Sequence, residues 1–192
     1  CWLLQMEKYL QQTKSDCIKI VLLGPESTGK STLTKQLAKY YKTDFVEEYA
    51  REYLQKKYDH NGSICQIDDI IPIAKGQMNL ENYAIKNNSL IFCDTNLLTT
   101  MVYSKIYFNY CDPILEKYAK SNYYDIYLLM DIDIPWIKDD LRDKPNERKE
   151  MFDFFKSSLI ESQKSFNIIS GNFEERKEKA ISIINNLLNF TS

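Results

Sequence analysis

The chain has 192 residues, the length of roughly one domain, so we expect a single domain over residues 1–192. Its 44% hydrophobic and 27% charged residues are typical of a soluble globular protein and exclude a disordered or collagen-like chain. The net charge of -2 and the pI near 5.6 remove the usual electrostatic reason for holding a phosphate backbone, so no nucleic-acid partner is expected.

Cysteine usage favours a reducing, cytoplasmic location. The five cysteines are odd in number and show no CxxC spacing, which argues against a secreted disulfide framework and against zinc. The apolar runs are shorter than the ~18 residues of a membrane helix, so no membrane partner is expected. The sequence gives no prediction of oligomeric state.

Residues 1–17 are interpreted as an N-terminal extension, and the five residues before Met6 are left out of the predicted fold. The first strand is predicted at residues 18–23, an almost continuous apolar run. A glycine-bearing loop follows, and then a helix at residues 31–41, where Leu33, Leu37 and Tyr40 recur at helical spacing. The order is therefore strand, loop, helix.

Strands and helices continue to alternate along the rest of the chain. A charged stretch with Pro135 and Pro145, residues 131–148, is predicted to be a long, mobile lid. The other predicted strands are residues 43–46, 89–93, 124–130 and 166–169, the helices are 48–58, 68–86, 99–108, 113–119, one ending near 164, and 174–188, and a loop is expected at 59–63. This alternation predicts an α/β fold of the P-loop NTPase type, with a five-stranded, mostly parallel sheet covered by helices on both faces.

The segment GPESTGKS at residues 24–31 matches the phosphate-loop pattern G-x-x-x-x-G-K-S between a strand and a helix. Main-chain N–H groups of such a loop point at a phosphate, and the helix dipole adds positive potential. Lys30 is predicted to reach the β- and γ-phosphates of ATP, and the Ser31 hydroxyl to bind Mg²⁺. The predicted ATP-binding residues of this loop are Gly24, Glu26, Ser27, Thr28, Gly29, Lys30, Ser31 and Thr32.

A metal at this loop needs a carboxylate at the end of a neighbouring strand. Asp94 closes the predicted strand at 89–93 and is the candidate. The alternative is an aspartate that only makes a turn or caps the next helix, for which Asp94, Thr95 and Asn96 would also serve.

Motif absences narrow the class of nucleotide-binding protein. The sequence has no NKxD string, as a GTPase needs to read guanine, and no LSGGQ-like segment of an ABC ATPase. A small-molecule kinase remains, in which Arg142 and Arg148 of the lid would close over ATP, exclude water and neutralise the transferring group. The alternative for both arginines is a solvated loop.

The segment EYAREY at residues 48–53 is the candidate acceptor site. Glu48 is the predicted general base, and Arg51 lies on the same helical face and would orient a carboxylate or the acceptor. Tyr49, Tyr53 and Trp136 are candidates to stack on an aromatic or cationic acceptor. The alternative is an ordinary exposed, charged helix face. The adenine is expected at the turn that contains Ser170 and Gly171.

These motifs resemble the ribosylnicotinamide kinase domain of NadR-type proteins. The resemblance rests on GPESTGKSTL at 24–33, EYAREY at 48–53, IAKGQ at 73–77, FCDT at 92–95, and PWIKDDLR at 135–142 with RKE at 148–150. It implies transfer of the ATP γ-phosphate to the 5′-hydroxyl of nicotinamide riboside, giving nicotinamide mononucleotide. It also implies ATP and Mg²⁺ at Lys30, Ser31 and Asp94, and leaves Asp94 as a rival of Glu48 for the role of base.

NadR-type proteins also carry a nucleotidyltransferase domain with an HxGH signature, and this chain has one histidine. We therefore expect no adenylylation of the mononucleotide by this chain. Two alternatives stay open: a P-loop kinase for another nucleoside or vitamin, and a non-catalytic module that binds ATP and regulates a partner.

Overall fold

The computed structural model describes residues 2–135 and 147–191. Its five strands form one sheet in the order β2-β3-β1-β4-β5, and every neighbouring pair is parallel. This confirms the predicted five-stranded α/β fold, with a sheet that is entirely parallel rather than mostly so. The strands are β1 (Ile18–Leu23), β2 (Phe45–Val46), β3 (Leu90–Asp94), β4 (Ile126–Met130) and β5 (Asn167–Ile169).

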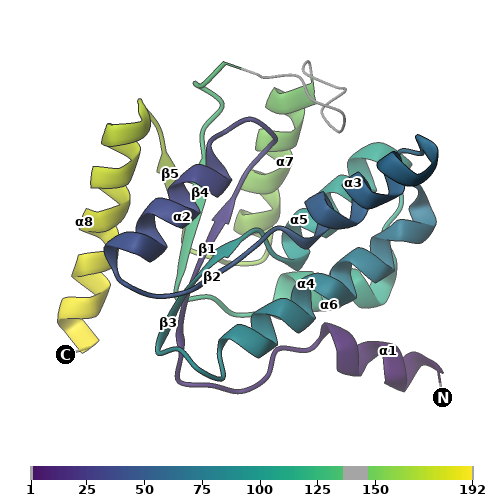
Figure 1. Cartoon of the computed structure of the whole chain (residues 1–192), viewed down its shortest axis with the longest axis horizontal. Helices are drawn as coiled ribbons and strands as arrows, with labels where there is room; N and C mark the ends of the chain where they lie inside the picture. Colours follow the sequence, from purple (N-terminus) through teal and green to yellow (C-terminus); the bar gives the residue numbers. More distant parts are fainter. Residues whose placement is uncertain (1, 136–146, 192) are drawn as a thin grey trace.

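Helices cover both faces of the sheet (Figure 1). The helices are α1 (Trp2–Leu10), α2 (Lys30–Tyr40), α3 (Tyr49–Asn61), α4 (Ile70–Ala84), α5 (Leu97–Phe108), α6 (Pro113–Ser121), α7 (Arg148–Glu161) and α8 (Phe173–Thr191), with a short 3₁₀ turn, η1 (Ile67–Asp69), before α4. Within this part of the chain, no helix combines the length and the apolar character needed to cross a membrane.

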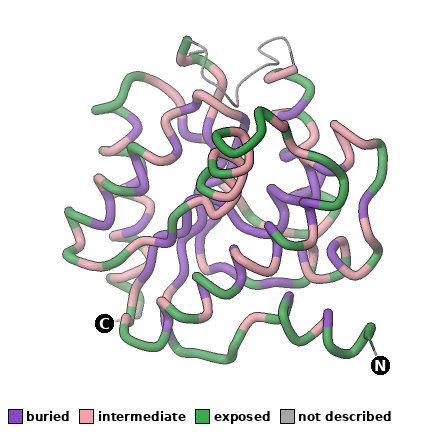
Figure 2. The backbone as a smooth tube through the Cα atoms, turned by 45° about the vertical axis from the view of Figure 1, so that its right-hand side comes forward, coloured by how far each residue is buried: buried purple, intermediate pink, exposed green. Residues whose placement is uncertain are grey.

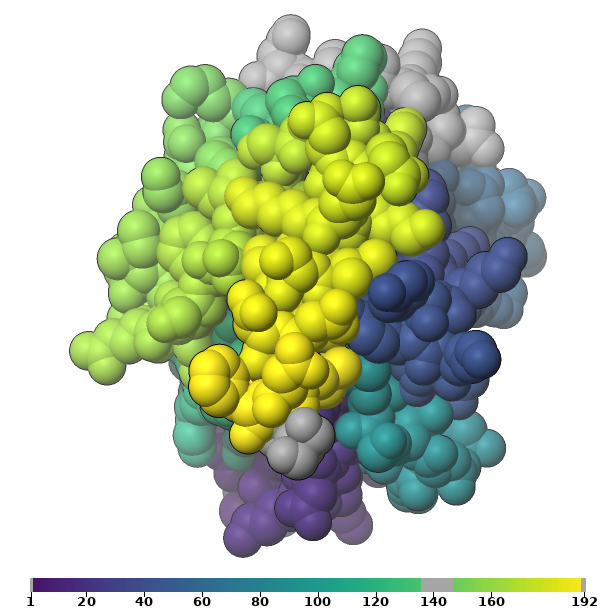
Figure 3. Space-filling model, turned by 90° about the vertical axis from the view of Figure 1, so that its left-hand side faces the viewer, coloured from purple at the N-terminus to yellow at the C-terminus, as the bar shows by residue number. Residues whose placement is uncertain are grey.

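Alternate side chains of the strands pack into two hydrophobic cores, one on each face of the sheet. Ile20 and Leu22 of β1 pack with α2 and α8, whereas Val21 and Leu23 pack with α4, α5, α6 and α7. Because both faces are buried, the strand reads as a continuous apolar run rather than as an alternating one. Figure 2 shows the buried strands at the centre of the molecule. Figure 3 shows α8, in yellow, facing the viewer with α2, in blue, beside it.

The structure differs from the predicted elements most clearly in α3 and α4. The loop expected at 59–63 is wrong in its first half, because α3 continues to Asn61 and ends at Gly62, whose φ of 70° favours glycine. The helix expected at 68–86 is divided into η1 and α4, with Pro72 in the first turn of α4. Of the predicted lid at 131–148, residues 136–146 lie outside the described residues, and with them Trp136 and Arg142.

The N-terminal segment packs against the domain from Met6 onward, whereas residues 2–5, which the predicted fold left out, are helical and exposed. Helix α1 begins at Trp2, and its Met6 and Leu10 are buried in the core beside α4 and α6. Farther along, the Gln12 side-chain amide donates to a Glu81 carboxylate oxygen at 3.0 Å. The amphipathic spacing of Met6 and Leu10, i and i+4, is what places both on the buried face.

Gly76 in α4 allows a close contact between two helices. A Cβ atom at this position would lie 2.0 Å from a carbon of the Tyr49 ring. The glycine that weakens the helix in isolation is therefore the residue that lets α3 approach α4, which lie side by side in Figure 1.

We expect Gly76→Ala to lower the free energy of unfolding by about 1 to 3 kcal/mol, because the Tyr49 ring must move. Helix propensity alone predicts the opposite sign, a gain of roughly 1 kcal/mol. Urea unfolding distinguishes the two, with Asn79→Ala on the exposed face of α4 as the control that stays within about 0.5 kcal/mol of the parent. A Gly76→Ala protein that is more stable than its parent would contradict the packing explanation.

Candidate active site

The phosphate loop connects the end of β1 to the first turn of α2. Gly24 has a φ of 142°, and a Cβ there would lie 3.0 Å from the Met130 main-chain oxygen, so β4 leaves no room for a side chain. Gly29 has a φ of 78° immediately before Lys30, the first residue of α2. The Thr28 hydroxyl donates to the Pro25 carbonyl at 2.8 Å and closes the loop internally. The loop therefore presents its N–H groups at the positive end of α2.

Lys30 is 7% exposed, and its ammonium group forms no ion pair with the described residues. It lines the same cavity as the loop itself. A largely buried ammonium without a carboxylate partner is costly in a protein interior, so an anion at this place is the compensating ligand that the geometry favours.

Asp94 lies next to the phosphate loop, because β3 pairs with β1 and brings Asp94 opposite Leu22. The Ser31 hydroxyl donates to Asp94 Oδ2. The second oxygen, Oδ1, is buried and has no hydrogen-bond partner within the described part of the chain. A hydroxyl and a carboxylate in contact are hard oxygen donors of the kind that Mg²⁺ uses, and Mg²⁺ sites retain several water ligands. The pair therefore fits a magnesium ion bound largely through water and substrate.

Arg148 begins α7 and reaches the phosphate loop. Its guanidinium donates to the Ile134 carbonyl at 2.7 Å and to the Ser27 carbonyl at 3.4 Å, while its Nε is buried without a hydrogen-bond partner among the described residues. Burial and the neighbouring Arg176 guanidinium lower the pKa of Arg148. Of the two predicted lid arginines, the structure thus places Arg148 against the loop, and Arg142 lies outside the described residues.

The predicted adenine turn is tied to the segment after β4. The Ser170 hydroxyl donates to an Asp131 carboxylate oxygen at 2.7 Å, and the Gly171 N–H donates to Asp133 Oδ2 at 2.6 Å. Burial alone would raise the pKa of Asp133, but the Gly171 N–H and the Arg176 guanidinium hold it below its usual range. Neither Ser170 nor Gly171 lines the cavity described below.

Arg176 on α8 is an anchor that the sequence analysis did not identify. Its side chain is 1% exposed and donates to the Thr28 and Gly171 carbonyls, both at 2.7 Å, and to Asp133. It therefore joins the phosphate loop to the predicted adenine turn. Its helical spacing could have indicated its burial: Arg176, Ala180 and Ile184 are four residues apart and lie on the buried face of α8.

We expect Arg176→Met to lower the free energy of unfolding by about 2 to 4 kcal/mol, since the buried carbonyls lose a charged donor. Nucleotide affinity should fall as well, because Thr28 in the phosphate loop loses its anchor. Urea unfolding and nucleotide titration test this, with Lys177→Met, the next residue of α8, as the control. Unchanged stability and affinity in Arg176→Met would contradict the anchoring role.

A cavity of about 380 Å³ joins the phosphate loop to the candidate acceptor side. This volume lies within the roughly 300 to 1,000 Å³ of small-molecule sites. Glu48 and Arg51 line it together with Lys30 and Ser31. The lining residues are Glu26, Ser27, Thr28, Gly29, Lys30, Ser31, Thr32, Glu48, Ala50, Arg51, Leu54, Ile64, Cys65, Ile70, Ile73, Gln77, Thr95, Thr99, Thr100, Tyr103, Tyr107 and Phe108.

Tyr49 and Tyr53 do not line this cavity. The Tyr49 ring packs over Gly76, and the Tyr53 hydroxyl donates to Asp69 Oδ1 at 3.0 Å. Burial alone would raise the pKa of Asp69, but hydrogen bonds from Lys57, the Gln66 N–H and Tyr53 hold it below its usual range. Tyr49 thus contacts α4, and Tyr53 contacts η1.

The aromatic side chains that do line the cavity come from α5, and the sequence analysis missed them. Tyr103 and Tyr107 lie with ring centroids 5.6 Å apart, and Phe108 follows at the end of the helix. Their i, i+4 spacing was available in the sequence, but α5 is apolar on most sides and gave no sign of which face meets a ligand. Cys65 also lines the cavity, and burial raises the pKa of its thiol to about 11, so it stays protonated near neutral pH.

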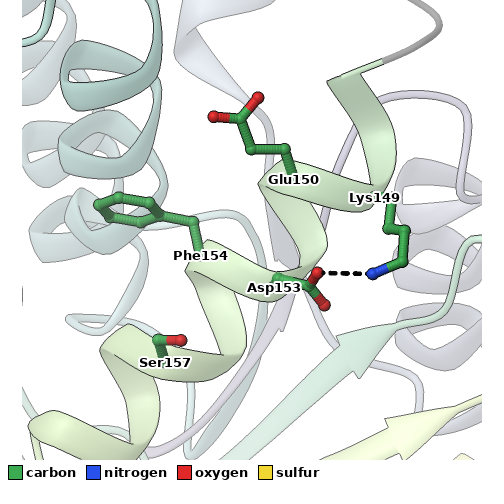
Figure 4. A pocket seen from close by; sticks show the side chains of 5 residues that line it. All are labelled: Lys149, Glu150, Asp153, Phe154 and Ser157. Carbon is green, nitrogen blue, oxygen red and sulfur yellow. Dashed lines mark hydrogen bonds and ion pairs between the residues drawn. The ribbon is translucent and has the colours of Figure 1, made fainter.

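A second hollow lies on the surface of α7 (Figure 4). It is lined by Lys149, Glu150, Asp153, Phe154 and Ser157, and Lys149 pairs with Asp153 at 2.9 Å along the helix. None of the predicted site residues lines it. An exposed i, i+4 ion pair is weak, and the hollow has no buried polar group to hold a ligand.

A protein-family model described as AAA domain matches residues 19–176, which include the phosphate loop, Asp94 and Arg176. The chain belongs to the AAA domain family. This AAA domain carries the P-loop NTPase fold predicted from the sequence, with the phosphate loop between β1 and α2.

Relatives of this AAA domain include the trifunctional NAD biosynthesis/regulator protein NadR of Escherichia coli (strain K12), 31% identical over 152 residues. The match covers 78% of this chain and 36% of the relative, so the chain spans about a third of the length of that protein. A crystal structure of NadR protein in complex with NR is 26% identical, with a TM-score of 0.74 over 88% of this chain and 49% of that one. The predicted resemblance to NadR-type proteins is confirmed.

Thymidylate kinase from Ehrlichia chaffeensis is similar in fold alone, at 14% identity and a TM-score of 0.63, covering 88% of this chain and 98% of that one. The predicted P-loop kinase architecture therefore extends to proteins with little sequence similarity. The fold alone therefore does not identify the acceptor, because one fold can serve many functions.

Proposed function

We propose that this chain transfers the γ-phosphate of ATP to the 5′-hydroxyl of nicotinamide riboside, giving nicotinamide mononucleotide for NAD biosynthesis. The observation that carries the proposal is the continuous cavity between the phosphate loop and Glu48 with Arg51. The likeness to NadR, which has been crystallised with NR, supports this choice of acceptor. The location proposed for the reaction is the cytoplasm, on the cysteine usage of the sequence.

ATP is the proposed phosphate donor. Its triphosphate would lie on the N–H groups of residues 24–31, with Lys30 neutralising charge on the β- and γ-phosphates. Ser31 and Asp94 would hold Mg²⁺, which supplies further neutralisation of the phosphates when bound. Arg148 lies at the Ser27 carbonyl of the phosphate loop, where it would neutralise the group in transfer.

Glu48 is the proposed base. The acceptor oxygen attacks the γ-phosphorus, a bond forms between them, and the bond from that phosphorus to the β–γ bridging oxygen breaks, leaving ADP. The hydroxyl proton passes to the Glu48 carboxylate, and Arg51 would orient the acceptor. In this proposal Asp94, whose Oδ2 accepts from Ser31, serves the metal rather than the proton.

The acceptor ring would lie toward α5, against Tyr103 and Tyr107, rather than on Tyr49 or Tyr53. Stacking on an electron-rich ring suits a cationic pyridinium and is worth about 0.5 to 2 kcal/mol. Trp136, the third predicted stacking residue, lies outside the described residues.

Mass spectrometry of the products formed from ATP and a panel of nucleosides tests the proposal. We expect nicotinamide mononucleotide, formed at a kcat within the usual range of about 1 to 10³ s⁻¹. If another nucleoside or vitamin were phosphorylated in preference, that compound would be the acceptor. If ATP bound but no acceptor were phosphorylated, the chain would be a regulatory module rather than an enzyme.

A further inference from the structure

Gln77 on α4 bonds the main chain on both sides of Glu48. Its Oε1 accepts from the Tyr49 N–H at 2.9 Å, and its Nε2 donates to the Glu47 carbonyl at 3.0 Å. The side chain is 4% exposed. Only this orientation of the amide satisfies both partners, since one is a donor and the other an acceptor.

The segment held in this way connects β2 to α3. Glu47 and Glu48 are the only residues between β2 and α3, and Glu48 precedes α3 in an extended conformation, with a φ of -70° and a ψ of 102°. The Glu48 side chain does not cap α3, so the Tyr49 N–H at the start of the helix is satisfied by Gln77 instead. No residue of α3 is fully buried, so packing fixes this helix less firmly than the others.

Gly76, the residue before Gln77, completes the contact. The Tyr49 ring occupies the space that a Gly76 Cβ would need. Adjacent residues of α4 therefore fix the main chain and the side chain of Tyr49, the residue that follows Glu48. The segment IAKGQ, to which the sequence gave no role, packs against EYAREY through these contacts.

We propose that Gln77 is a positioning residue for Glu48: its amide fixes the main chain around Glu48 so that the carboxylate is directed into the cavity beside Arg51. This inference rests on the proposed function, because it assigns Glu48 to the acceptor hydroxyl. A carboxylate that takes a proton in the transition state must be held within a few tenths of an ångström, so loss of its support lowers turnover more than substrate binding.

The test compares Gln77→Met with Asn82→Leu in the full chain. Methionine keeps the length of the side chain and removes both hydrogen bonds. Asn82 is a matched control in the same helix, because it makes the same pair of bonds elsewhere: it accepts from the Thr13 N–H at 2.9 Å and donates to the Gln11 carbonyl at 3.0 Å. It lies outside the cavity lining.

We expect Gln77→Met to lower kcat by about 10- to 100-fold, the range for residues that orient a functional side chain, while the KM for ATP changes less than about twofold. Asn82→Leu should keep kcat within about twofold of the parent. In a Glu48→Ala background, Gln77→Met should cause no further loss, because a residue that acts through Glu48 has nothing left to position.

Amide hydrogen exchange gives a second readout that needs no acceptor. The Tyr49 N–H should exchange faster in Gln77→Met than in Asn82→Leu. If the parent protein phosphorylates no nucleoside, the proposed function fails whatever the exchange result. If the parent is active, an unchanged Tyr49 exchange rate, or a full additional loss in the Glu48→Ala background, would overturn the positioning role. The second result would instead indicate that Gln77, which also lines the cavity, contacts the substrate.

Discussion

Replacing Lys30 with alanine is expected to abolish phosphoryl transfer, with a loss of about 10³-fold or more. Phosphoryl transfer depends on positioning and on neutralising charge, and Lys30 is the cation that the first turn of α2 presents at the phosphate loop. Because Lys30 is largely buried, its charge acts on the phosphates at a low effective dielectric constant. Water that entered the variant would not supply an equal attraction.

The change should leave the fold intact. Alanine is the best helix former, and the hydrogen bond that Thr34 makes in this turn goes to the main-chain carbonyl of residue 30, which the variant keeps. Transfer is measured by product formation and nucleotide binding by titration, with Lys39→Ala, on the exposed end of α2, as the control. Near-normal turnover in Lys30→Ala would remove the phosphate loop from the mechanism.

The second large effect separates the two candidate carboxylates. Glu48→Gln is expected to lower kcat by about 10² to 10⁴-fold, the usual contribution of a positioned base, with ATP binding retained. Glutamine keeps the size of the side chain and removes its ability to take a proton. Glu48 lines the cavity but is not part of the phosphate loop proposed to hold ATP, so the affinity for ATP is expected to change little.

Asp94→Asn is expected to behave differently. It should raise the Mg²⁺ concentration needed for half-maximal activity, because Asp94 and Ser31 form the proposed metal site. Measuring kcat against Mg²⁺ concentration for the two variants distinguishes the roles. If at saturating Mg²⁺ Asp94→Asn kept a loss of kcat of about 10² to 10⁴-fold and Glu48→Gln lost little, Asp94 would be the base.

The local motifs were predictable because they depend on chain geometry over a few residues. A loop that must turn with positive φ at Gly24 and Gly29 and then enter a helix carries its pattern in the sequence. The same holds for the alternation of apolar strands and helices, since both faces of a parallel sheet are buried. The placement of Asp94 followed from these two facts, because parallel strands end at one edge of the sheet.

The contacts around the acceptor were not predictable in this way. Tyr49 and Tyr53 stand beside Glu48 in the sequence, yet the approach of α3 to α4 directs them to Gly76 and Asp69. The aromatic lining comes instead from Tyr103 and Tyr107, about fifty residues farther along the chain. Arg176 was likewise not predictable, because its partner in the phosphate loop, Thr28, is 148 residues away.

The sequence by itself determined the parallel α/β architecture, the phosphate loop with Lys30 and Ser31, and the carboxylate at Asp94, since each follows from local periodicity or from the end of a strand. Only the tertiary structure decided which side chains meet in the cavity, and that Gln77 and Arg176 bond main-chain groups of two segments beside it. The physical reason is that a packed interior joins residues by the angles at which helices meet, and no short stretch of sequence contains those angles.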